Sequence, residues 1–221
     1  MNDSTPSAPH AADLGGAADA SSAPARSTDP TATAPVVADG SAQPPAAPAV
    51  SAVPEADRSR PEVTPEDLEV LQEQLGRPAR GVVGIAARCV CGRPLVVHTA
   101  PRLPDGTPFP TTYYLTSPGA VAGASTLEAN SVMKEMSERL TQDEALAAAY
   151  TRAHEHYLAA RESLGHVEEI AGISAGGMPV RVKCLHVLVG HALAAGPGVN
   201  PLGDEALVMI SGTWRADRCT C

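Results

Sequence analysis

Regular alternation of apolar and polar residues begins near residue 63 of the 221-residue chain. Residues 64–67, Thr-Pro-Glu-Asp, combine an N-cap residue, a proline at the first helical position and acidic side chains that complement the free amides of a helix start. Leu68, Leu71 and Leu75 then recur at helical spacing, and Gly76 follows as a helix-ending residue. This pattern predicts a short amphipathic helix.

Three short runs of β-branched and apolar residues follow this helix. They cover residues 82–87, 94–99 and 111–116, and the connection before the last run contains an Asp105-Gly106 turn signal. Because short successive strands joined by turns pair most simply with their neighbours, we expect a three-stranded antiparallel meander.

The second half of the chain has helical signals. Residues 125–140 contain few helix breakers, and the capping box Thr-Gln-Asp-Glu at 141–144 starts a helix that we expect over 142–164. A further helix is expected over 179–195, and a short one after Gly203-Asp204-Glu205. Together these elements predict an α+β fold in which a small antiparallel sheet of about three strands packs with four to five helices.

The first 62 residues show neither the helical nor the strand period. They consist almost wholly of Ala, Pro, Ser, Thr, Asp and Gly, which cannot bury enough apolar surface to offset the entropy of ordering the chain. We therefore expect a disordered tail over 1–62, a single α+β domain over 63–215, and a separate C-terminal end over 216–221.

Charge and hydropathy narrow the classes of function. The formal net charge of −9 argues against general nucleic-acid binding, because such proteins neutralise phosphates with clustered Lys and Arg. The N-terminal sequence MNDSTPSAPH lacks the basic and apolar segments of a secretory signal, and this predicts a cytoplasmic protein. The most apolar window, residues 184–195, is too short to span a bilayer, so no membrane span is predicted.

An odd number of cysteines, five, indicates reduced thiols or metal binding more than a disulfide framework. Cys89 and Cys91 lie between two predicted strands, in a turn that ends in Gly92. Zinc prefers thiolates, and paired cysteines in a tight turn can present two of them at once, although the usual spacing has two intervening residues. The alternative is a pair of free thiols in a hairpin.

Two sources could supply further zinc ligands. Cys184 with His186 or His191 is one of them, but their separations along a helix of two, five and seven residues do not place all three on one centre. The other source is the terminal Cys219-Thr220-Cys221, which either closes a four-cysteine site or is an unbound end. The expected ligands are Cys89, Cys91, Cys184 and His191.

Basic residues after a glycine turn provide a second hypothesis. Gly176 and Gly177 precede a predicted helix whose first turns carry Arg181 and Lys183, so free amides and cations converge where an anion could bind. The matching function is an enzyme or sensor for a phosphorylated small molecule or polyphosphate. The simpler interpretation is a capped core helix whose Arg and Lys reach solvent.

Nucleophilic catalysis by Cys184 with a histidine is a third and less favoured hypothesis, because a cysteine on an apolar helix more often packs as a small buried side chain. The sequence has no nucleotide-binding glycine loop, metalloprotease motif or nucleophile elbow. Several large classes of enzyme are thereby excluded.

Several blocks resemble, in order, a bacterial family catalogued as domain of unknown function 501. They are QLGRPARG at 74–81, RCVCGRP at 88–94, TAPRLPDGTPFPTTYYLT at 99–116, LAAAYTRAHEHYLAAR at 146–161 and GGMPVRVKCLHVLVGHALAAGPGVNPLGDEAL at 176–207. The resemblance covers nearly all of residues 66–210 and implies no activity, since none is assigned to the family. We therefore expect a binding or regulatory module with a structural zinc site, whose partner is a protein or a phosphate-containing ligand.

Overall fold

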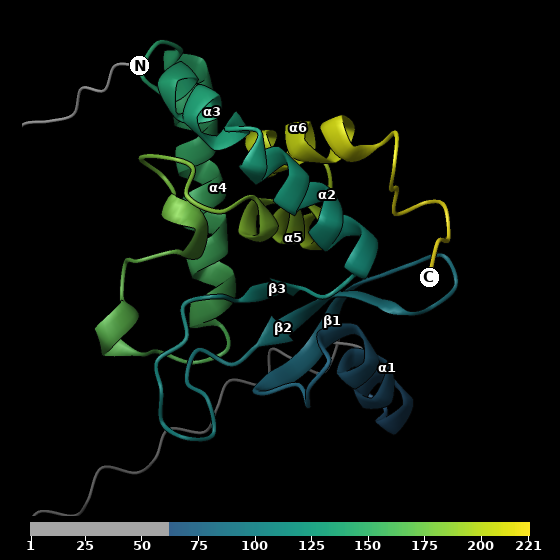
Figure 1. Ribbon diagram of the computed structural model, residues 1–221. Helices are drawn as coiled ribbons and strands as arrows, with labels where there is room; N and C mark the ends of the chain where they lie inside the picture. Colours follow the sequence, from purple (N-terminus) through teal and green to yellow (C-terminus); the bar gives the residue numbers. More distant parts are fainter. Residues whose placement is uncertain (1–61) are drawn as a thin grey trace, which may run out of the picture. The chain divides into compact units, whose positions relative to one another are not determined.

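The computed structural model describes residues 62–221, and Figure 1 shows their arrangement. The predicted disorder of residues 1–62 therefore lies outside the described residues, apart from Glu62. The helices are α1 (Pro65–Leu75), α2 (Pro118–Ala129), α3 (Val132–Leu140), α4 (Glu144–Glu162), α5 (Leu185–Ala195) and α6 (Pro201–Ile210). The strands are β1 (Val82–Arg88), β2 (Pro94–Thr99) and β3 (Tyr113–Leu115), and two short 3-10 turns are η1 (Glu168–Ile170) and η2 (Ala175–Gly177).

The strands form the predicted antiparallel meander in the order β1-β2-β3. Ile85 pairs with Val97 across β1 and β2, and Val96 pairs with Leu115 across β2 and β3. The strand β2 is central and buried along nearly its whole length, which explains why its sequence is apolar without alternation. The predicted α+β class and the three-stranded sheet are confirmed.

Helices cover both faces of the sheet. In Figure 1, α1 lies beside β1 at the lower right, α2, α3, α5 and α6 lie above the sheet, and α4 runs from above the sheet down to the level of β3. On the α1 side, Leu71, Ile85 and Val97 form a small apolar cluster. The main core lies on the other side, where residues of β2 and β3 pack against α2 to α6. The sheet is therefore the middle layer of three.

Two helix boundaries differ from the prediction. The expected helix over 125–140 is divided into α2 and α3, because Ser131 between them has a left-handed backbone with φ of 64°. The helix α2 also begins earlier than expected, at Pro118. The helix expected from Pro179 begins at Leu185, and that start was predicted wrongly. The amides of Arg181 and Lys183 donate to the carbonyls of the Gly-Gly turn, at 3.1 and 2.7 Å, so this segment folds back on the turn. Residues 62–221 hold six α-helices, where four to five helices were expected.

The helix α5 packs at the centre of the helical layer because two glycines allow close approach. A Cβ at Gly190 would lie 2.9 Å from the carbonyl oxygen of Tyr113, so this glycine lets α5 contact the backbone of β3. A Cβ at Gly203 of α6 would collide with the carbonyl oxygen of Leu188 on α5. The middle of α5 is thereby held against β3 on one side and against α6 on the other.

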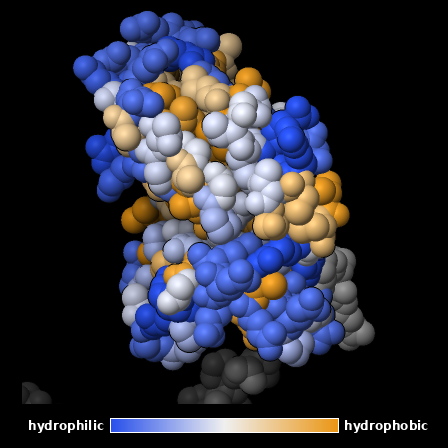
Figure 2. All heavy atoms as spheres, turned by 45° about the vertical axis from the view of Figure 1, so that its right-hand side comes forward, coloured by the Kyte–Doolittle hydropathy of each residue, from blue (hydrophilic) through white to orange (hydrophobic). Residues whose placement is uncertain are grey.

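Figure 2 shows hydrophilic residues at both ends of one face and hydrophobic residues exposed in the region between them. Within residues 62–221 the large exposed apolar side chains come from several separate elements: Leu68, Val83, Val90, Ile173, Val180, Val208 and Met209. No helix among the described residues is both long and apolar enough to cross a membrane.

Candidate metal centre

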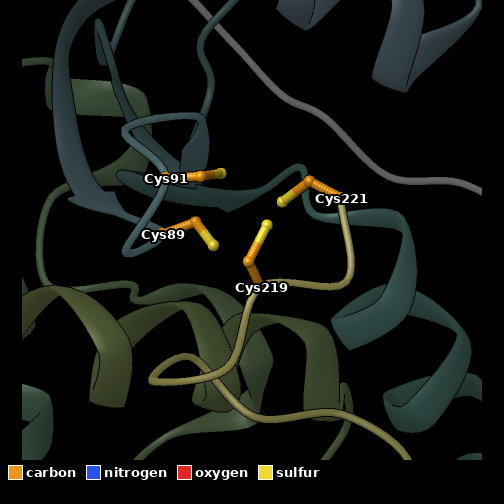
Figure 3. A group of neighbouring side chains, drawn as sticks. All are labelled: Cys89, Cys91, Cys219 and Cys221. Carbon is orange, nitrogen blue, oxygen red and sulfur yellow. The ribbon is translucent and has the colours of Figure 1, made fainter.

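The β1–β2 turn presents Cys89 and Cys91. The amide of Cys89 donates to the carbonyl of Arg93 at 2.9 Å, and the amide of Gly92 donates to the carbonyl of Cys89 at 2.8 Å. Gly92 has φ of 91°, a conformation that favours glycine, so the turn can close tightly. The single intervening residue, Val90, is exposed, and both thiols project from one side of the turn (Figure 3).

Ion pairs hold this turn against α1. The guanidinium of Arg88 donates to both carboxylate oxygens of Asp67, at 2.7 and 2.8 Å, and to the carbonyl of Gly92 at 2.8 Å. The hydrogen bonds from Arg88 lower the pKa of Asp67 to about 2. Arg93, at the end of the turn, pairs with Glu73 of α1 at 2.5 Å. These ion pairs therefore hold the turn against α1 without any contribution from the C-terminal segment.

The C-terminal segment returns to this turn after α6. Trp214 is buried against Gly119 at the start of α2, and its amide donates to the carbonyl of Ile210 at 2.9 Å. A bridge between Arg215 and Arg218 then reverses the chain. This reversal carries the last residues to the β1–β2 turn, where Figure 1 also places the C-terminus.

Four cysteine sulfurs converge where the two segments meet. The Sγ atoms of Cys89, Cys91, Cys219 and Cys221 all lie within 4.8 Å of one another. Figure 3 shows the four side chains directed toward a common centre, two from the turn and two from the C-terminal segment. With a zinc–sulfur distance of about 2.3 Å, sulfurs in a tetrahedral site lie about 3.8 Å apart, so four sulfurs that all lie within 4.8 Å of one another are close enough to hold one metal ion.

The thiols of this cluster have different pKa values. The backbone of Arg93, followed by the thiol of Cys219, lowers the pKa of Cys91 to about 7. Burial raises the pKa of Cys89 and, together with the neighbouring thiols, raises that of Cys221 to about 12. Four thiolates so close together repel one another. The positive charge of a coordinated metal ion offsets this repulsion and keeps the thiols deprotonated.

Cys184 belongs to a second group, with Glu128 and His186. Its Sγ lies 3.8 Å from Nδ1 of His186, and the same nitrogen lies 3.1 Å from Oε1 of Glu128. The hydrogen bonds with Cys184 and Glu128 raise the pKa of His186 to about 9. The structure thus places Cys184 with Glu128 and His186, and places Cys89 and Cys91 with the C-terminal pair that the sequence left open.

His191 lies in neither group and is fully buried between aromatic rings. Its ring stacks on Tyr113 with centroids 5.3 Å apart and meets the edge of Tyr157 at 5.2 Å. Its Nε2 lies 3.0 Å from Nδ1 of His156, and its Nδ1 lies 3.1 Å from the amide nitrogen of Asn200. These contacts connect α5 with α4, β3 and the start of α6, so the geometry gives His191 a packing role.

Acidification is expected to act on stability through His191. Burial and the neighbouring His156 lower its pKa to about 3, so between pH 6.5 and 3 the unfolded chain binds a proton that the folded chain does not. Stability from this group is therefore present at neutral pH and lost as the pH falls. Between pH 7 and pH 5 the loss is about 2 kcal/mol for an unfolded pKa near 6.5.

Urea unfolding of the wild type and of His191→Gln at both pH values measures this loss. The free energy of unfolding of the variant is expected to change less between pH 7 and pH 5, by about 2 kcal/mol. His156 is present in both proteins, and Tyr113, Tyr157 and Asn200 do not titrate in this range. Equal changes in the two proteins would contradict the assignment.

The expected anion-binding residues do not meet at a helix start. Gly176 and Gly177 have φ of 79° and 90°, and a Cβ on Gly176 would contact Leu188 at 2.9 Å, so these glycines serve a tight turn and close packing. Arg181 and Lys183 are exposed in the segment before α5. Their proposed role toward a phosphorylated ligand stays a prediction, without the helix amides on which it was based.

Sequence reasoning missed two residues: Arg161, which the structure buries in the core, and Glu128, which it places beside Cys184 and His186. Arg161 is fully buried, and it continues the stripe of Tyr150, Ala153 and Tyr157 on α4, so helical spacing alone could have found it. Glu128 lies near the end of an apolar helix, 56 residues before Cys184, and no local pattern connects the two.

The comparisons with known proteins place the chain in a family. A family model described as protein of unknown function (DUF501) matches residues 85–208, which include the β1–β2 turn and the Glu128–Cys184–His186 group but not the last two cysteines. No curated protein and no solved structure matches the chain. Since the matched segment is more than half of the 221 residues, the chain belongs to the family of proteins of unknown function named DUF501.

Proposed function

We propose that this protein is a binding module built around a structural zinc ion, which Cys89, Cys91, Cys219 and Cys221 hold. The observation that carries the proposal is the convergence of these four sulfurs within 4.8 Å from two segments about 130 residues apart in sequence. Four thiolates without an open position are typical of structural zinc sites, whereas catalytic sites keep a position free.

The zinc ion would fix the C-terminal end against the β1–β2 turn. The turn is already anchored through Arg88 and Asp67, so the C-terminal segment is the part that metal binding orders. Ordering of a segment by metal makes part of the binding free energy a folding free energy. The need for reduced thiols fits the cytoplasmic location that the sequence predicts.

A cavity beside the centre is a candidate for the binding surface of the module. It has a volume of about 250 Å³, and the C-terminal residues Thr220 and Cys221 line it together with Trp214, Arg93 and Glu73. Because the C-terminal residues form part of its wall, the cavity exists in this shape only while the segment is held. Zinc would thus control whether the module can bind its partner, which is the regulatory function that we propose.

The metal content of Cys184→Ser protein tests the proposal, because this substitution leaves the four clustered cysteines intact. After purification under reducing conditions without chelators, we expect about one equivalent of zinc per chain by elemental mass spectrometry. Less than about a tenth of an equivalent would overturn the proposal. Iron in place of zinc would correct the metal, since tetrahedral sulfur sites bind either. A protein mass that shows disulfides among these cysteines would also overturn it.

A further inference from the structure

A second group of side chains combines a carboxylate, a thiol and an imidazole at the edge of a larger cavity. Glu128, Cys184 and His186 each direct one ligand atom to a common region, and these atoms lie within 4.8 Å of one another. The distances are 3.8 Å from Sγ of Cys184 to Nδ1 of His186 and 3.1 Å from that nitrogen to Oε1 of Glu128. All three residues are partly buried.

Two helices position this group. Cys184 is the N-cap residue of α5 and His186 is in its first turn, while Glu128 lies near the end of α2. The amide of Leu185 donates to Oε1 of Glu128 at 2.7 Å, which fixes the carboxylate at the start of α5. The second ring nitrogen of His186, Nε2, lies 3.1 Å from the hydroxyl oxygen of Ser125. The carboxylate of Glu128 and the ring of His186 are therefore each held in place by a hydrogen bond to a residue outside the group.

The geometry favours a metal site over a catalytic triad. In a triad, the histidine contacts the nucleophile through one ring nitrogen and the acidic residue through the other. Here one nitrogen, Nδ1, faces both the thiol and the carboxylate, and the other faces Ser125. Three ligand atoms that converge on one point, with an outer hydrogen bond to the far nitrogen of the histidine, are the arrangement of a metal site and its supporting shell.

The cavity next to this group has a volume of about 530 Å³, which is large enough for a small molecule. Cys184 and His186 form part of its wall. Most of the rest is apolar or aromatic and includes Tyr114, Leu115, Pro118, Val121 and Val187. A metal ion held at the wall would therefore face a pocket that fits a ligand with an apolar body.

We propose that Glu128, Cys184 and His186 bind a divalent metal ion, with the chemistry of zinc, and that its remaining coordination position opens toward this cavity. Thiolate, imidazole and carboxylate are the three donors that zinc uses in proteins, and three protein ligands with an open position distinguish catalytic from structural zinc sites. The open position would take an oxygen atom of a small ligand. This inference does not depend on the four-cysteine centre.

A variant in which Cys89, Cys91, Cys219 and Cys221 are all serine tests the proposal, because Cys184 is then the single cysteine of the chain. Cobalt(II) added to the metal-stripped protein is expected to bind at about one equivalent with thiolate-to-cobalt absorption. Any such absorption reports Cys184 alone. The result is therefore independent of whether the other four cysteines bind zinc.

Substitutions in this single-cysteine protein separate direct ligands from supporting groups. Glu128→Gln keeps an oxygen that can accept from Leu185 and is expected to weaken cobalt binding by more than about 100-fold. Ser125→Ala should weaken it by about 10-fold, as the loss of an outer-shell partner does. The control is Glu138→Gln, on the exposed surface of α3, which should leave affinity unchanged.

The wild-type chain provides a check that does not depend on the folding of a protein with four cysteines replaced. Cys184→Ser is expected to lower its bound zinc by about one equivalent, while exposed His166→Ala lowers it by none. The proposal is overturned if the single-cysteine protein binds no cobalt and Cys184→Ser leaves the zinc content unchanged. It is also overturned if Cys184 of the single-cysteine protein reacts with iodoacetamide at the same rate with and without metal, which would show that the metal does not coordinate this thiol.

Discussion

Replacement of Cys219 and Cys221 by serine is expected to weaken zinc binding at the four-cysteine centre by at least about 1,000-fold. Structural zinc sites bind with an apparent free energy of roughly 10–16 kcal/mol, and two of the four thiolates contribute a large share of it. A loss of only about 4 kcal/mol already corresponds to a factor of 1,000. Competition against a chromophoric zinc chelator under reducing conditions measures the affinity.

Cys184→Ser is the matched control, because it removes one thiol from outside the centre. This control should retain the tight affinity, and the same Cys184→Ser protein with Cys219 and Cys221 also replaced by serine should lose it. The cavity beside the centre should lose its C-terminal wall in the double variant, which faster proteolysis of residues 215–221 would report. Equal zinc affinities in the double variant and the control would show that the C-terminal cysteines are not ligands.

Replacement of Arg161 by methionine is expected to lower the free energy of unfolding by about 3–5 kcal/mol. Arg161 is fully buried, and its guanidinium donates to the carbonyls of Ile173 and Ile170 at 2.5 and 2.7 Å. Methionine fills similar space but donates no hydrogen bond, so the carbonyls of Ile170 and Ile173 would lose these partners. The expected decrease in the midpoint of thermal unfolding is about 10 °C for a domain of this size.

Arg152→Met on the same helix provides the comparison, because Arg152 is exposed. Its effect on the free energy of unfolding should stay within about 0.5 kcal/mol. Chemical denaturation of both variants with unchanged slopes separates a loss of stability from a change in the unfolded state. If the two substitutions cost the same, Arg161 does not hold the segment between α4 and α5.

The two proposed metal sites also explain why the odd number of cysteines is informative. Four of the five cysteines form one cluster, and the fifth, Cys184, lies in a mixed group with Glu128 and His186. A tetrathiolate site needs an even set of cysteines, whereas a mixed site can use one. One chain would thus combine a centre that holds structure with a centre that faces a pocket.

The sequence by itself determined the local elements. The capping residues 64–67 and Gly76 bound α1 as predicted, and the apolar run of residues 94–99 forms the central strand. Such signals act through contacts within a few residues, so they can be recognised without the rest of the fold. The start of α5 was missed because the backbone of residues 181–183 pairs with Gly176 and Gly177 instead of continuing a helix.

Which candidate ligand residues come together was decided only by the tertiary structure. Cys89 and Cys91 were recognisable as a pair, but their meeting with Cys219 and Cys221 depends on the packing of Trp214 against Gly119 and on the chain reversal after it. The approach of Glu128 to Cys184 depends on the packing of α2 against α5. Contacts between residues far apart in sequence follow from how whole elements pack, and no local pattern of residues encodes that distance.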